Sequence, residues 1–256
     1  MRGAALLLAI AAACTRPRST SGTHTTPGTG PANRAAADAP TSPPPRVLRG
    51  GTFGLIAEGF PAIARAGDRY VVAYRQSDGE RGMPNLTIVV RAVGAVRDRV
   101  DAELARHEVL SVAEADTMLD DADGKNPALD ARVTRANRWL AELHAEHTLV
   151  RPLVLIPTPT RLLVDQTTAT GDGITVTWAA SRLRITDGAR VLVERVTPAT
   201  WLHAPARVGP TTCETPGYLG GAAIDRANRL AILTISYVSQ ADFCIEPSDQ
   251  HHAISW

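Results

Sequence analysis

The chain has 256 residues, a formal net charge of +1 at neutral pH and 44% hydrophobic residues. This composition is ordinary for a soluble globular domain, and no apolar run beyond the N-terminal segment is long enough to cross a bilayer. The near-neutral charge argues against nucleic acid as a partner, because proteins that bind nucleic acid normally carry a basic face.

The first 14 residues have the three parts of an export signal. Arg2 precedes an apolar stretch from Leu6 to Ala13, and small residues stand directly before Cys14. A charged start, a short apolar middle and small residues at the cleavage site are typical of such signals. The pattern resembles the signal of bacterial lipoproteins, whose cysteine is lipidated and becomes the new N-terminus. This resemblance implies a lipid anchor at Cys14, and an ordinary secretory signal is the alternative.

Residues 15–46 are rich in Thr, Pro, Ser, Gly and Ala and show no periodic apolar face. Such a segment buries too little apolar surface to offset the chain entropy lost on folding. We therefore expect a disordered linker over 15–46, followed by one β-rich globular domain over 47–256. In proteins that resemble this one, a threonine after the lipidated cysteine, as at Thr15, is compatible with the outer membrane. The resemblance thus implies a place in the cell envelope, facing the periplasm or the cell surface.

Much of the domain consists of short β-branched segments bounded by Gly, Pro, Asp or Asn, which predict strands joined in hairpins. The Asp187-Gly188 pair between two apolar runs predicts a tight hairpin turn, and Gly171-Asp172-Gly173 predicts a second turn. The predicted strands are 69–74, 86–93, 149–156, 161–165, 174–178, 183–186, 191–196 and 230–238.

One segment follows a helical period instead. Apolar residues recur at intervals of three and four from Leu129 to Leu143, with Asn126 as a candidate N-cap and Pro127 at the first helical position. We predict a helix at about 127–147 that packs on a sheet. The predicted fold class is mainly β (α+β), with antiparallel sheets built from hairpins in a partial propeller-like or sandwich arrangement.

Two segments, 62–72 and 223–232, share an order of residues: Ala-Ile, any residue, Arg-Ala, a turn, Arg and then an apolar strand. Each pattern predicts a hairpin. The first resembles the hairpin of periplasmic TolB-type β-propeller repeats, which implies a propeller-like sheet. A complete propeller needs at least four blades of about 40 residues, so a partial propeller or a sandwich fits the length better.

Cys213 and Cys244 are the cysteines that remain after Cys14. An exported chain enters an oxidising compartment, and the two residues flank the predicted strand 230–238. We predict a disulfide between them, which would stabilise the fold by roughly 3–4 kcal/mol. Two reduced, buried thiols and a catalytic cysteine are the alternatives, and no activating motif surrounds Cys213.

Two groups of residues have a weak metal-binding pattern. His144 and His147 lie three residues apart and share a helix face, a spacing that suits two zinc ligands, but the metalloprotease motifs are missing. Asp121, Asp123 and Asp130 fall at positions three, five and twelve of a calcium-binding loop whose first position is not acidic. We expect a solvated helix end and an acidic surface loop, and predict neither a metal nor another cofactor.

The aromatic residues and the last strand-like segment offer fewer clues. His251-His252, next to Trp256, is expected to form a polar strand or tail. The large aromatic side chains are expected in the core or at its rim, and a sugar- or peptide-binding face lined by some of them is the alternative. They are Trp139, Trp178, Trp201, Tyr218 and Trp256.

The sequence contains no nucleophile elbow, phosphate-binding loop or dinucleotide-binding motif. It favours a non-enzymatic, membrane-anchored envelope lipoprotein, whose β-rich binding or scaffold domain contacts another envelope protein or polymer. A hydrolase or metal-dependent enzyme, with a site assembled from distant residues, is the alternative. The enzyme predicts a concave pocket where histidines or carboxylates converge with shifted pKa values, whereas the binding domain predicts a flatter surface.

Overall fold

A computed structural model describes residues 43–50, 54–76, 85–94, 102–115, 118, 125–204, 206–208, 211–213, 215–238 and 247–256, with the backbone alone at 206–208 and 211–213. All of these residues belong to the compact unit Thr41–Trp256. Cys14, Cys244, Asp121 and Asp123 lie outside the described residues. The lipid anchor, the disulfide and the acidic surface loop therefore stay predictions.

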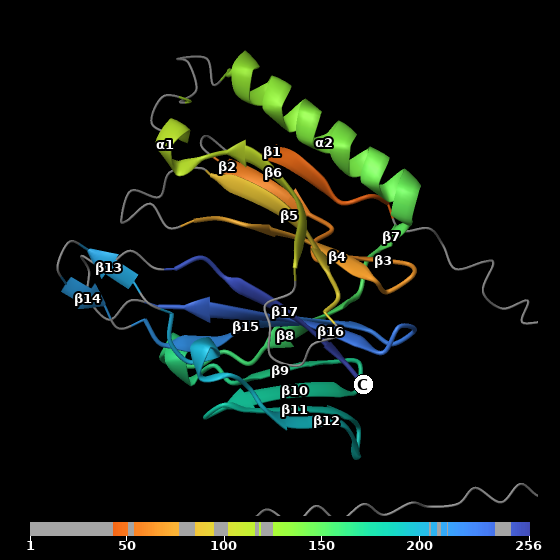
Figure 1. Ribbon diagram of the computed structural model, residues 1–256, viewed down its shortest axis with the longest axis vertical. Helices are drawn as coiled ribbons and strands as arrows, with labels where there is room; N and C mark the ends of the chain where they lie inside the picture. The colour runs from red at the N-terminus through yellow and green to blue at the C-terminus, as the bar shows by residue number, and fades with distance from the viewer. Residues whose placement is uncertain are drawn as a thin grey trace, which may run out of the picture. The chain divides into compact units, whose positions relative to one another are not determined.

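The fold is mainly β, with antiparallel sheets built from hairpins and one long helix, as the sequence predicts (Figure 1). The smaller of the two main sheets has five strands, in the order β6 (Glu103–Leu110), β5 (Leu86–Ala92), β4 (Arg69–Tyr74), β3 (Ala62–Ala64) and β7 (Leu149–Val150). Two short pairs, β1 (Arg46–Gly50) with β2 (Gly54–Glu58) and β13 (Ala206–Val208) with β14 (Thr211–Cys213), form small sheets of their own.

The larger main sheet has eight antiparallel strands and curls into a half-barrel. Its strands are, in spatial order, β12 (Arg190–Val196), β11 (Arg182–Asp187), β10 (Ile174–Ala179), β9 (Thr168–Gly171), β8 (Leu153–Pro157), β15 (Gly217–Asp225), β16 (Leu230–Tyr237) and β17 (Gln250–Ser255). Short helical segments complete the fold: α1 (Val112–Ala115), η2 (Leu163–Asp165) and η3 (Ala199–Trp201).

The long helix α2 (Pro127–His147) confirms the predicted boundaries. The side chain of Asn126 accepts a hydrogen bond from the Leu129 N–H at 2.9 Å, which caps the first turn. At the other end Thr148 has a φ of +48° and its N–H donates to the carbonyl of His144 at 2.7 Å. The apolar side of α2 is buried against the five-stranded sheet, as predicted.

The side chain of Asn137 on α2 pairs with the backbone of β1. The Val47 N–H donates to Oδ1 of Asn137 at 2.7 Å, and Nδ2 of Asn137 donates to the Val47 carbonyl at 2.9 Å. The amide of Asn137 thus pairs with the backbone of Val47 as a neighbouring strand would. Val47 itself is fully buried, so this pairing satisfies polar groups that water does not reach.

Three apolar clusters join the layers. The first lies between α2 and the five-stranded sheet, and the second, which we call the half-barrel core, fills the inside of the half-barrel. The third, which we call the inter-sheet cluster, lies between the five-stranded sheet and the neighbouring strands β15 and β16. It consists of Ile63, Tyr70, Val72, Val89, Ala223, Leu230 and Ile232.

The two segments that share a residue order are hairpins, β3–β4 and β15–β16. Both contribute to the inter-sheet cluster, and their turns touch: Nδ2 of Asn228 donates to the Arg65 carbonyl at 3.3 Å. Gly67 has a φ of +71° and lies close to Asn228. A β-carbon at position 67 would fall only 2.7 Å from the Cγ of Asn228. The similar segments therefore face each other across the two sheets, and the described strands do not close a propeller.

Both predicted tight turns are confirmed. Asp172 and Gly173 have φ values of +48° and +76° between β9 and β10, as a two-residue type I′ turn requires. Gly188 has a φ of +56° between β11 and β12.

The predicted strand 149–156 is two strands in different sheets. β7 belongs to the five-stranded sheet and β8 to the half-barrel, and Arg151-Pro152 lies between them. Pro152 has no N–H to donate to a sheet, so pairing ends there and the chain crosses from one sheet to the other.

The predicted strand 161–165 is wrong, because Leu163–Asp165 forms a turn of 3₁₀ helix. The hydroxyl of Thr160 donates to the Leu162 carbonyl at 2.7 Å, and the Asp165 N–H donates to the same carbonyl at 3.0 Å. These local bonds replace the pairing that a neighbouring strand would offer.

We expect Asn137→Leu to lower the free energy of unfolding by about 2 kcal/mol, because both backbone groups of Val47 would lose their partner while staying buried. Urea unfolding followed by circular dichroism measures this loss. Arg138→Ala, on the exposed side of the same helix, is the control and should change stability little. Equal effects of the two substitutions would contradict this role of Asn137.

Candidate functional site

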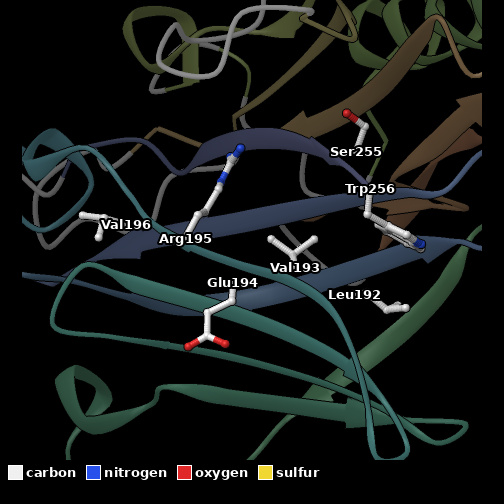
Figure 2. Close-up of a pocket in the computed structure, with 7 residues that line it drawn as sticks. All are labelled: Leu192, Val193, Glu194, Arg195, Val196, Ser255 and Trp256. Atoms are coloured by element: carbon white, nitrogen blue, oxygen red, sulfur yellow. The ribbon is translucent and has the colours of Figure 1, made fainter.

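The half-barrel leaves a cleft between its two end strands. Within the described part of the chain, β12 and β17 stand at opposite ends of the strand order, and a cleft of about 390 Å³ lies between them. Residues Leu192 to Val196 line it from β12, and Ser255 and Trp256 line it from the end of the chain (Figure 2). We call this cleft the seam.

The side chains of β12 alternate between the two sides of the strand, as the pleat of a sheet requires. Figure 2 shows Val193 and Arg195 pointing toward β17, whereas Glu194 points away from it. Val193 is buried and belongs to the half-barrel core. Val196 is 71% exposed, so an apolar side chain stands open to solvent at the end of β12. The seam is therefore apolar at its base and mixed at its rim.

Behind the seam, two tryptophans and a histidine pack in the half-barrel. The rings of Trp201 and His252 stack with centroids 3.8 Å apart, and Trp178 meets Trp201 at 6.4 Å with a tilt of 54°. Nε1 of Trp178 donates to Oγ1 of Thr197 at 3.0 Å. The prediction that Trp178 and Trp201 belong to the core is confirmed.

The expectation of a polar strand or tail at His251-His252 is half wrong. The segment is strand β17, but His252 is only 4% exposed and His251 is also largely shielded from water. Burial, with smaller effects of His251, Arg91 and Arg195, lowers the pKa of His252 to about 3. Burial and the charge of Arg91 lower the pKa of His251 to about 4. Both imidazoles are therefore neutral at physiological pH.

One pattern in the sequence does indicate this strand. His252, Ile254 and Trp256 follow each other at intervals of two, which is the period of a strand with one side buried. The adjacent pair His251-His252 led to the expectation of an exposed segment instead, because histidine is more often found at the surface than in a core.

The described residues around the candidate zinc ligands do not complete a metal site. Among the described residues, no group of three His, Cys, Asp or Glu side chains could hold a metal ion. Nη1 of Arg69 lies 2.9 Å from Nε2 of His147, and since arginine can only donate, that nitrogen accepts. Oε1 of Glu146 lies 3.2 Å from the same Nε2 atom. A nitrogen that accepts a hydrogen bond from Arg69 carries no proton that it could donate to Glu146, so Arg69 is the hydrogen-bond partner of His147. His144 instead has a buried Nδ1 without a hydrogen-bond partner in the described structure.

Of the candidate calcium ligands, only Asp130 is described. It lies in the first turn of α2, where its Oδ1 is 3.6 Å from Nε of Arg49. A negative charge at this position suits the helix dipole. Asp130 thus has a structural role that needs no metal.

Carboxylates with lowered pKa values pair with arginine. Hydrogen bonds from Arg132, and then from Ser111, lower the pKa of Glu114 to about 2, and the two guanidinium–carboxylate contacts with Arg132 measure 2.7 and 2.9 Å. Glu103 is paired in the same way with Arg106, which lowers the pKa of its carboxyl group. Neither pair lines the seam, so we regard them as structural ion pairs.

No protein-family model, curated protein or solved structure matches this chain. Within the described part, no helix has both the length and the apolar character to cross a bilayer. Its function therefore has to be inferred from its own residues and their geometry.

We expect the stability of the protein to fall as the pH falls from about 6.5 toward 4. In this range the unfolded chain protonates His251 and His252, whose pKa is about 6.5 when exposed, while the folded protein keeps both neutral. The unfolded state therefore binds more protons, and the free energy of unfolding rises with pH by up to about 1.4 kcal/mol per pH unit for each such proton.

The variant His252→Phe tests this assignment, because it keeps an aromatic ring against Trp201 but cannot titrate. Urea unfolding at several pH values above about 4.5, where most carboxylates stay ionised, should give a shallower slope for the variant than for the parent protein. Identical slopes would show that His252 does not contribute.

Proposed function

We propose that the protein is a lipid-anchored binding protein of the cell envelope, and that its β-rich domain holds an extended peptide segment of a partner protein at the seam. The observation that supports this most is the position of β12. It is an end strand of a curled sheet, it borders a cleft, and it carries exposed apolar side chains.

End strands present backbone N–H and C=O groups that another chain can pair with. An added strand gains main-chain hydrogen bonds from such an edge, and its alternate side chains enter whatever pockets lie beside it. Val191 and Val196 on β12 are 41% and 71% exposed, so a bound segment would also cover apolar surface. Both contributions favour binding of an extended chain.

The shape of the seam favours a peptide over a compact ligand. Its wall on β12 follows five consecutive residues, Leu192 to Val196, which extend over roughly 17 Å in a strand. Side chains of the bound segment that point into the half-barrel would meet Val193 and Trp256. We therefore expect these side chains of the partner to be apolar. Outward side chains would lie on the side of Glu194, so polar residues suit those positions.

The seam offers little to an enzyme. The histidines nearest to it on β17 are kept neutral by burial, and the perturbed carboxylates of Glu103 and Glu114 pair with arginines elsewhere. General acid–base catalysis needs a group whose pKa lies near the working pH, within reach of the substrate. Non-enzymatic binding accounts for this arrangement better than hydrolysis does.

The expected anchor suits such a role. The predicted linker over residues 15–46 would hold the domain roughly 30 Å from a lipid at Cys14. The seam could then reach partners in the envelope while the domain stays attached to the membrane.

The anchor predicts where the protein is found. In a bacterial host that processes lipoproteins, the full chain should fractionate with the membranes, whereas Cys14→Ala should be released into the soluble fraction because it has no residue to lipidate. Immunoblots of the two fractions measure this, and Thr15→Ala is the control that keeps the cysteine. Equal distribution of the parent and Cys14→Ala would refute the anchor.

The seam predicts which residue matters for the partner. We expect Val196→Lys to weaken capture of the partner about ten-fold, because a charged side chain would replace an exposed apolar contact on the edge strand. Chemical crosslinking in the envelope, followed by purification and quantitative mass spectrometry, measures the captured partner.

Ile156→Lys is the matched control. Ile156 is 72% exposed, nearly the same as Val196, but it lies on β8 away from the seam. Its substitution should leave capture unchanged. If Ile156→Lys abolished capture and Val196→Lys did not, the partner would bind the outer side of the half-barrel and not the seam.

A further inference from the structure

A second hollow lies on the outer side of the half-barrel, across the strands β10, β11 and β12. It has a volume of about 410 Å³, and we call it the outer groove. The strand β12 separates it from the seam, so Glu194 to Val196 border both. Its lining consists of Thr177 and Ala179 of β10, Arg182, Leu183 and Arg184 of β11, and Glu194, Arg195 and Val196 of β12.

The pleat of β11 places two arginines side by side in this groove. Leu183 is buried in the half-barrel core, so its neighbours Arg182 and Arg184 point to the outer side. Residues two apart on a strand are separated by roughly 7 Å, a distance that two long side chains can close toward a common ligand. Both arginines are exposed, so a ligand from solvent reaches them directly.

These two arginines differ from most others in the domain. Arg106 and Arg132 hold carboxylate oxygens at 2.8 and 2.7 Å. Neither Arg182 nor Arg184 forms an ion pair or a hydrogen bond with a residue that the structure describes. Glu194 lies directly opposite Arg184 in the strand register, yet no ion pair joins them. Within the described structure, the donors of both guanidinium groups are therefore available to an anion.

The other lining groups indicate which anion suits the groove. Thr177 lies opposite Arg184, and its hydroxyl places a neutral donor beside the two guanidinium groups. Guanidinium groups match phosphate oxygens with paired, charge-assisted hydrogen bonds. Ala179 and Val196 lie opposite Arg182, one on each side, and Val196 is 71% exposed. The groove thus offers donors to a phosphate group and apolar surface to the organic part of its ester.

We propose that the outer groove binds a phosphate ester, whose oxygens accept hydrogen bonds from Arg182, Arg184 and Thr177. The headgroup of an anionic phospholipid and a small soluble phosphate ester share this chemistry. The volume falls within the range of roughly 300–1,000 Å³ that is usual for small-molecule sites. Glu194, which points away from β17 (Figure 2), is the one lining group whose charge opposes the ester. This site goes beyond peptide binding at the seam and does not depend on it.

The test is calorimetric titration of the unlipidated full chain at low salt with two soluble probes, glycerol 1-phosphate and dihexanoyl phosphatidylglycerol. We expect at least one of them to bind, and glycerol, which carries no phosphate, not to bind. Tighter binding of the short-chain lipid would identify a phospholipid headgroup as the source of the ligand. Equal or tighter binding of glycerol 1-phosphate would identify a free phosphate ester.

Substitutions in the groove should change this affinity in opposite directions. Arg182→Gln and Arg184→Gln should each bind the ester about ten-fold more weakly, because each loses a charge-assisted hydrogen bond. Glu194→Gln should bind it about three-fold more tightly, because the opposing charge is removed. Arg190→Gln is the matched control. Arg190 is exposed on β12 and removes the same charge from the same hairpin, but it does not line the groove, so affinity should change little.

Failure of both probes to bind at millimolar concentration would overturn the proposal. Equal weakening by Arg182→Gln and Arg190→Gln would also overturn it, because the ester would then respond only to the net charge of the hairpin. Neither Arg182 nor Arg184 lines the seam, so both variants should capture the peptide partner as the parent does. This result separates the outer groove from the seam.

Discussion

Eight antiparallel strands bend around one apolar core, and the position of the seam depends on this packing. Trp178 and Trp201 fill the inside of the half-barrel together with aliphatic side chains from most of its strands. Curling lets the sheet bury one face against itself, which a flat sheet of the same length could not do. In the described part, however, β12 and β17 do not pair with each other, so the half-barrel stays open between them. The seam follows directly from this incomplete closure.

The strands β15 and β16 connect the half-barrel with the rest of the domain. In β16, Leu230 and Ile232 face the inter-sheet cluster, while Ala231 and Leu233 face the half-barrel core. A strand that is buried on both faces needs apolar residues at successive positions, and β16 has them. The same strand ends at Tyr237, which also belongs to the half-barrel core. One strand thus contributes to both the half-barrel core and the inter-sheet cluster.

The local features of this fold could be predicted from the sequence. The period of three and four residues, with Asn126 as its cap, predicted α2, and Asp187-Gly188 predicted the hairpin of β11 and β12. Features that depend on distant contacts could not be predicted. The break at Pro152 moves the chain between sheets, and the burial of His252 requires Trp201, which lies far from it in the sequence. The seam was missed for the same reason, since its two sides come from strands that are separated by most of the half-barrel.

The central claim is that β12 is the strand to which a partner adds. Hydrogen exchange of backbone amides, measured on the full chain with and without the crosslinked partner, tests it most directly, because amides gain protection when they enter new hydrogen bonds. The account predicts that residues 190–196 gain protection when the partner binds, while β8 and α2 stay unchanged. Protection of the outer side of β8, with none on β12, would contradict it.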